Sequence, residues 1–131
     1  MPKQAVTSPK LRDPQGSYSH AIVVTGPGRF VFVSGMTARK ADGSIAGIGD
    51  IAAQTRQVCE NLEAALEAAG GSLDDVCSID VFVRNIEHMD TIRKVRREYF
   101  RGVAPASTMV EVTKLAMPEL LIEISAIASL P

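Results

Sequence analysis

Hydrophobic and polar residues alternate with a period of two near both ends of the chain. Residues 20–25 (HAIVVT) and 29–35 (RFVFVSG) are rich in β-branched and aromatic side chains, and the Gly-Pro-Gly between them suits a tight turn. This pattern predicts one antiparallel hairpin. Two further strand-like runs lie within residues 105–128, and residues 3–8 are a candidate for an additional N-terminal strand.

The period lengthens toward that of a helix in the middle of the chain. Asp50 can cap a helix in which apolar residues recur every three or four positions, and Gly70 and Gly71 can end it. Residues 76–85 then alternate as a strand. Before this helix, the small and glycine-rich residues 36–49 predict a surface loop, and loops of this length often carry function.

A second helix is predicted within residues 89–99. Its apolar residues lie on one side, whereas Arg93, Arg96 and Arg97 lie largely on the other. Such a cluster is more often a solvated helix face than an anion site. We therefore interpret these arginines first as surface residues.

The order β, β, α, β, α, β, β predicts an α+β fold with a mixed β-sheet, in a single domain that spans residues 1–131. Right-handed crossovers between the strands place both helices on one face of the sheet. The opposite face then carries apolar residues such as Phe82, Leu121 and Ile127 without a cover. We expect the chain to self-associate through this face.

Composition narrows the classes of partner. With 14 basic and 15 acidic residues, the chain has no overall charge that would attract nucleic acid or an anionic membrane. It lacks a signal-peptide pattern and any run of the ~20 apolar residues that a membrane span needs, so we expect a cytoplasmic protein. His20 and His88 have no third metal ligand at a suitable spacing, and no nucleotide-binding motif occurs. We expect neither a metal ion nor a cofactor.

Two carboxylates interrupt the closing strands. Glu123 shares a strand face with Leu121 and Ile127, which is the face predicted to meet another subunit. Two interpretations remain open for it: an interface salt bridge, or a general base poised by partial burial. Glu111 alternates differently along its own strand, and we expect it to have a structural role.

Six segments of the chain follow one another in a specific order: GSYSHAI, VFVSGM, DIAAQTRQVCENLEAALEAAGGSLDDV, VFVRN, PASTMVEVTKL and LIEISAIA. In this order they resemble the Rid family, small trimeric proteins typified by reactive-intermediate imine deaminases. The resemblance covers almost the whole chain from Gly16 onward. It implies a chorismate mutase-like fold, a homotrimer with a central β-barrel, and clefts between subunits that bind a small-molecule substrate.

The resemblance also implies roles for single residues. Glu123 matches the family's water-positioning carboxylate on the last strand, and Tyr18, Ser34 and Gly35 match positions that line the pocket. Active deaminases have Pro-Ala-Arg where this chain has Pro-Ala-Ser, so Ser107 occupies the position of the arginine that holds the substrate carboxylate. A serine hydroxyl cannot supply that charge-assisted clamp.

Two other arginines could return the lost charge. Arg93 stands where the family usually has an asparagine on the second helix. Arg39 lies in the loop SGMTARKADGSIAG, which with the following DIAAQTR resembles the 2-aminomuconate deaminase branch. A guanidinium in this loop could hold a substrate carboxylate through two hydrogen bonds.

Three functions therefore remain open. The first is a hydrolase that deaminates an enamine or imine acid, such as an aminomuconate-type ring-cleavage product, with Glu123 activating water and ammonia leaving. The second is a Rid-fold protein that binds a small metabolite with altered or no chemistry, because Ser107 replaces the arginine. The third is a ribonuclease or translation inhibitor, which the near-neutral charge and the absence of a basic stripe with aromatic residues disfavour.

Overall fold

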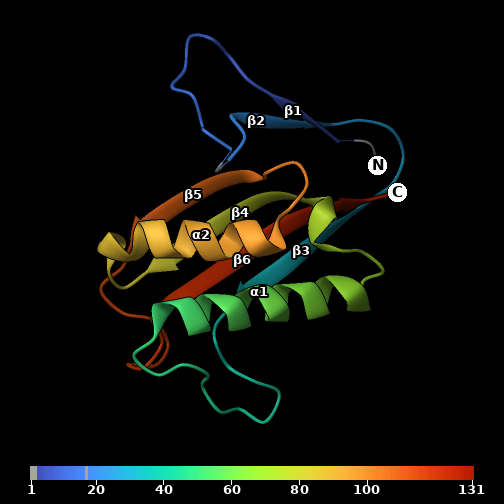
Figure 1. Ribbon diagram of the computed structural model, residues 1–131. Helices are drawn as coiled ribbons and strands as arrows, with labels where there is room; N and C mark the ends of the chain where they lie inside the picture. Colours follow the sequence, from blue (N-terminus) through green and yellow to red (C-terminus); the bar gives the residue numbers. More distant parts are fainter. Residues whose placement is uncertain (1–2, 17) are drawn as a thin grey trace.

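The computed structural model describes residues 3–16 and 18–131 and contains a four-stranded sheet, a separate two-stranded sheet and two long helices (Figure 1). The elements are β1 Lys3–Val6, β2 Ala21–Val24, β3 Arg29–Met36, α1 Ile51–Ala68, β4 Val76–Val83, α2 Met89–Tyr99, β5 Ala106–Glu111 and β6 Ile122–Leu130, with short 3₁₀ helices at Leu73–Asp75 and Ile86–His88. The order of the larger sheet is β3-β6-β4-β5. Strand β6 is antiparallel to β3 and β4, whereas β5 is parallel to β4.

Both long helices cover the same face of the larger sheet, so the predicted α+β fold with a mixed sheet is confirmed (Figure 1). Helix α1 begins as predicted, because Asp50 Oδ1 accepts a hydrogen bond from Ala53 N at 3.1 Å. It ends just before Gly70, whose φ of 88° is strained for residues with a Cβ. The capping and ending signals thus fix the length of α1.

The hydrophobic core lies between the helices and the sheet. Alternate residues of the central strands point toward the helices, so Val81 of β4 and Ile124 of β6 are fully buried. Helix α1 covers them with a stripe of apolar residues at helical spacing. The largest fully buried apolar side chains are Leu62, Leu66, Ile79, Ile92, Leu120, Ile122, Ile124 and Leu130.

The predicted hairpin of residues 20–25 and 29–35 is wrong. Strand β2 pairs with β1, with Ala21 opposite Val6, whereas β3 pairs with β6. The alternation is real in both segments, but a period of two does not specify the partner strand. The candidate strand in residues 3–8 satisfies the backbone of β2 instead, and Lys3 Nζ ties this pair to Val76 O at 2.7 Å.

The face of the sheet opposite the helices is open in the single chain, as the alternation predicted. Phe32 is 76% exposed, and Ile127, its partner across β3 and β6, is also exposed. Strand β3 is an edge of the sheet, because it pairs only with β6. Among the described residues, no helix is long and apolar enough to cross a membrane.

Candidate functional site

A cavity of about 230 Å³ lies between α2, the start of β5 and the N-terminal segment. We call it the arginine pocket. The parallel register of β4 and β5 places Ser107 beside Ile79 and Met109 beside Val81, which puts both on the helical face of the sheet. The residues that line the pocket are Tyr18, Met89, Arg93, Arg96, Ser107 and Met109.

The N-terminal segment is held against the pocket by Ser19. Its backbone N donates a hydrogen bond to Pro105 O at 3.1 Å, and its hydroxyl donates to Ala104 O. Ser19 is buried, so these bonds are shielded from water. They place the neighbouring Tyr18 at the pocket, where the resemblance expected a lining tyrosine.

Arg96 is the charged residue that the sequence patterns placed wrongly. It is only 5% exposed, and its Nη2 lies 3.5 Å from Ser107 Oγ, which is long for a hydrogen bond. The reason is periodicity, because Arg96 follows the buried Ile92 by four positions and therefore shares its helix face. Arg93 is half-buried and Arg97 is exposed, so only Arg97 fits the solvated face that was expected.

The electrostatic surroundings of Arg96 are positive. Burial is the main cause that lowers the pKa of Arg96 to about 10; Cys59 opposes this shift, and the charges of Arg93 and Arg97 add to it. Burial likewise raises the pKa of the Cys59 thiol to about 12. At pH 7 the guanidinium of Arg96 is therefore still charged, whereas the thiol beside it is neutral.

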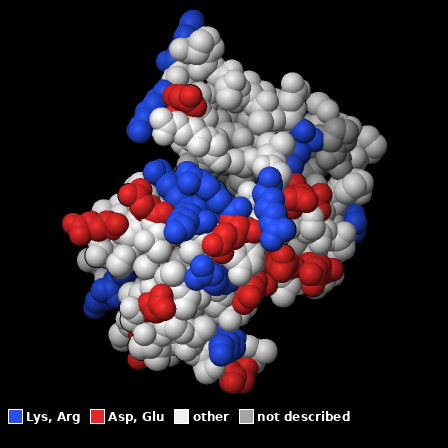
Figure 2. Space-filling model, in the orientation of Figure 1, with Lys and Arg blue, Asp and Glu red and all other residues white. Residues whose placement is uncertain are grey.

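A second, narrow cavity adjoins the arginine pocket. It shares Arg93 and Arg96 with the pocket and adds Arg97 to its wall. Figure 2 shows Lys and Arg side chains gathered in the middle of this side of the molecule, below the N-terminal strand pair. No Asp or Glu is among the described residues that line either cavity. The arrangement is suited to an anion.

Glu123 lies on the other face of the sheet. It pairs with Phe82 across β6 and β4, so its side chain is on the open face, as predicted. Gly35 of β3 lies directly beside it, since a Cβ at position 35 would overlap Glu123 Oε2 and lie 2.8 Å from Cδ. The register of β3 shifts between Val33 and Met36, which spans Ser34 and Gly35. Such bulges re-aim side chains and are frequent next to active sites.

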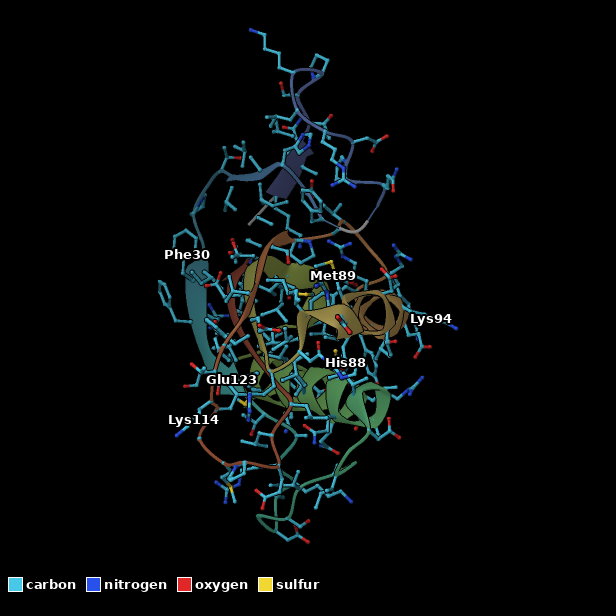
Figure 3. All side chains as sticks on the ribbon, turned by 90° about the vertical axis from the view of Figure 1, so that its left-hand side faces the viewer. Phe30, His88, Met89, Lys94, Lys114 and Glu123 are labelled. Atoms are coloured by element: carbon cyan, nitrogen blue, oxygen red, sulfur yellow. The ribbon has the colours of Figure 1, made fainter. Side chains whose placement is uncertain are left out.

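The predicted site residues therefore form two separate groups. Tyr18, Arg93 and Ser107 line the arginine pocket on the helical face, whereas Ser34, Gly35 and Glu123 lie together in the sheet, with Glu123 on the open face. Figure 3 displays this separation, with Glu123 on the side of the strands and Lys94 of α2 on the opposite side. The sheet stands between the two groups in one chain.

Arg39 lies apart from both groups. It is exposed in the loop after β3, forms a bridge with Ile45, and its backbone O accepts a hydrogen bond from Asn61 Nδ2 at 2.8 Å. The structure gives Glu111 the structural contact that was expected, because its Oε1 accepts a hydrogen bond from Ile86 N at 3.0 Å. His20 Nδ1 accepts a hydrogen bond from Ser8 N, and the centroid of its ring lies 6.1 Å from that of Tyr18.

Gln54 supports strand β6, and the sequence analysis did not identify it. It is fully buried in α1, donates to Glu119 O at 2.9 Å, and accepts from Leu121 N at 2.9 Å. These two bonds fix the chain just before β6, the strand that carries Glu123. The only signal in the sequence is a polar residue at a position where the helix period expects an apolar one.

Comparisons with known proteins agree with this architecture. Residues 9–130 match the family model described as endoribonuclease L-PSP. A RutC family protein of Pyrococcus abyssi is 38% identical over 128 residues, which cover 98% of this chain and 98% of the relative.

Two solved structures extend the likeness to three dimensions. A Rid family protein of unknown function from Yersinia pestis is 31% identical, with a TM-score of 0.91 over 99% of this chain and 100% of that chain. A member of the YjgF/YER057c/UK114 family from Mycobacterium tuberculosis is 34% identical, with a TM-score of 0.70 over 98% and 100% of the two chains. The chain belongs to the Rid family.

Proposed function

We propose that the protein is an enamine or imine deaminase-type hydrolase that acts on a small metabolite with a carboxylate. Glu123 accepts a proton from a water molecule as the water oxygen bonds to the imine carbon, and the electron pair of the C=N bond moves to nitrogen. Glu123 passes this proton to the nitrogen, which gives a carbinolamine. It then takes the proton of the new hydroxyl group and delivers it to the nitrogen, so that the C–N bond breaks and ammonia and a carbonyl compound result. General base catalysis of this kind typically accelerates a reaction by ~100- to 10,000-fold.

The observation that carries this proposal is the fit between Glu123 and Gly35. An exposed carboxylate usually has many rotamers. Here the bulge of β3 and the missing Cβ of Gly35 leave space for the Glu123 carboxylate beside the backbone of β3. Positioning a catalytic group in this way lowers the entropic cost of reaching the transition state. A plain interface charge would not require such a close approach.

The assembly supplies the rest of the proposed site. Because Glu123 and the arginine pocket are on opposite faces of one sheet, they can meet only when the open face of one subunit approaches the pocket of another. We propose a homotrimer with a central β-barrel, in which three such clefts form. The exposed Phe32 and Ile127 give the open face an apolar surface that association would bury.

The residues that line the arginine pocket support one class of substrate. A carboxylate-bearing imine or enamine acid, such as an aminomuconate-type ring-cleavage product, suits a pocket whose charged residues are arginines. Arg39 would contribute only if the exposed loop after β3 reached the cleft of a neighbouring subunit. No cofactor or metal ion takes part in this reaction.

A second function is favoured by one observation, the serine at position 107. If the pocket holds a ligand without aligning it for attack by water, the protein would bind a small metabolite and turn nothing over. A ribonuclease activity, which the description of the family model suggests, has less support. The formal net charge is −1 and aromatic residues make up 5% of the chain, whereas single-strand binding needs a basic groove with stacking side chains.

The test is ammonia release from 2-aminomuconate and from simple 2-iminoacids. We expect turnover by the wild type and a loss of ~100-fold or more for Glu123→Gln, which keeps the shape of the side chain and removes the base. Glu111→Gln is the matched control and should retain most of the activity, since its contact is with backbone outside the site. Equal rates for Glu123→Gln and the wild type would overturn the role of Glu123, and no release by the wild type would favour the binding protein.

A further inference from the structure

We propose that Arg96, together with Arg93, makes the arginine pocket selective for small dicarboxylates, and that Arg96 takes over the anchoring role for which Ser107 is unsuited. This inference rests on the proposed function in one respect, because it concerns the same cleft. It narrows the substrate from carboxylates in general to dicarboxylates, of which 2-aminomuconate is one, and it names the residue that specifies them.

The first argument is the position of Arg96. The residue is buried at the wall that the arginine pocket shares with the second cavity, and its Nη2 is 3.5 Å from Ser107 Oγ. A longer side chain at position 107 would have to enter this space. Serine is short enough to leave room for a guanidinium that arrives from α2 instead of from β5.

The second argument is the number of positive charges. Arg93 and Arg96 both line the pocket, and Arg97 lies in the adjoining wall. One guanidinium can hold one carboxylate through two parallel hydrogen bonds. Two guanidinium groups in one cavity therefore match two carboxylates better than one.

The third argument is size and shape. The cavity of about 230 Å³ lies below the roughly 300–1,000 Å³ of pockets for drug-sized ligands, so it suits a metabolite of a few carbons. Met89 and Met109 give it an apolar wall that can adapt to a short carbon chain. Charged ends on arginine and an apolar middle on methionine describe a short dicarboxylic acid.

Calorimetric titration with 2-oxoglutarate and with 2-oxobutyrate tests the inference on the whole protein. We expect the dicarboxylate to bind at least about tenfold more tightly, and Arg96→Met and Arg93→Met each to remove most of this preference. Arg93 is half-buried, so its variant keeps the test valid if Arg96→Met does not fold. Lys94→Met is the control, because Lys94 is an exposed cation of the same helix and lines neither cavity.

Several results would overturn the inference. These are equal affinity for the two oxoacids, a preference that survives in both arginine variants, or a loss of equal size in Lys94→Met. Inorganic phosphate that binds more tightly than 2-oxoglutarate would also overturn it, in favour of a phosphorylated ligand. The oxoacids carry no imine, so binding is measured without turnover. Dicarboxylate binding without ammonia release would therefore contradict the hydrolase alone.

Discussion

Gly35 shows how much a single missing Cβ can matter to the site. Its φ is outside the left-handed region, so alanine would fit the backbone, and the obstacle is the side chain of Glu123. That carboxylate is the end of a flexible side chain and can move away at little cost in stability. The role of Gly35 is then to leave space for a carboxylate in one position.

We predict that Gly35→Ala reduces turnover by about 100-fold, since a displacement of about 1 Å can have an effect of this size. The midpoint of thermal unfolding should hardly change. Gly102→Ala is a suitable control, because its Cβ would meet only an Asp74 side-chain oxygen, at 3.3 Å. Steady-state rates and a thermal melting curve are measured for each variant. Full activity in Gly35→Ala would show that the space beside Gly35 does not position Glu123 for catalysis.

The sequence predicted the position of Glu123 but not that of Arg96. The alternation of β6 was enough to place Glu123 on the open face. It could not place Arg96, because the cluster of three arginines was interpreted as one unit although its members differ in phase along the helix. The four-residue spacing from Ile92 carried the information, and a count of helical phase for each arginine would have predicted a buried guanidinium.

Helix α1 holds the chain segments next to β3 and β6 through two of its polar residues. Gln54 binds Glu119 and Leu121 before β6, and Asn61 donates to Thr37 O and Arg39 O after β3, both at 2.8 Å. Both chain segments that flank the Glu123 and Gly35 pair are thus held by one helix. The apolar stripe of α1 builds the core, and its polar members set the positions of the loops.

We predict that Gln54→Met destabilises the protein by about 1–3 kcal/mol, because it leaves the part-buried Leu121 N–H and Glu119 carbonyl without this partner. Methionine has nearly the same length, so a cavity contributes little to the loss. Urea unfolding measures the change in free energy. Gln57→Met is the matched control on the same helix, where the lost bond is only to Asn61, and an equal effect in both variants would contradict the special role of Gln54.

Elements were easier to predict than their pairing. The bounds of α1 follow from its period, the Asp50 cap and Gly70, which act over a few residues, and the period alone indicates α2. The partner of β2 is not encoded in its own alternation: β2 pairs with β1, and β3 pairs with β6. Gly26, with φ of 89°, lets the chain turn away between β2 and β3 instead of folding back as a hairpin.

The single chain carries the two parts of the proposed site on opposite faces of its sheet. The arginine pocket is complete within one chain, whereas the face of Glu123 is apolar and exposed. Association through this face would bury Phe32 and Ile127 and bring a carboxylate to a neighbour's pocket. Function in this account belongs to the assembly and not to the subunit.

The measurement that tests this claim most directly is complementation in mixed oligomers of Glu123→Gln and Arg96→Met subunits. Each variant alone should be inactive in ammonia release. When equal amounts are unfolded and refolded together, random assembly into trimers gives about one quarter of the clefts both intact halves, so about one quarter of the wild-type activity should return. Mixed trimers, verified by mass, that stay as inactive as the separate variants would contradict a site shared between subunits.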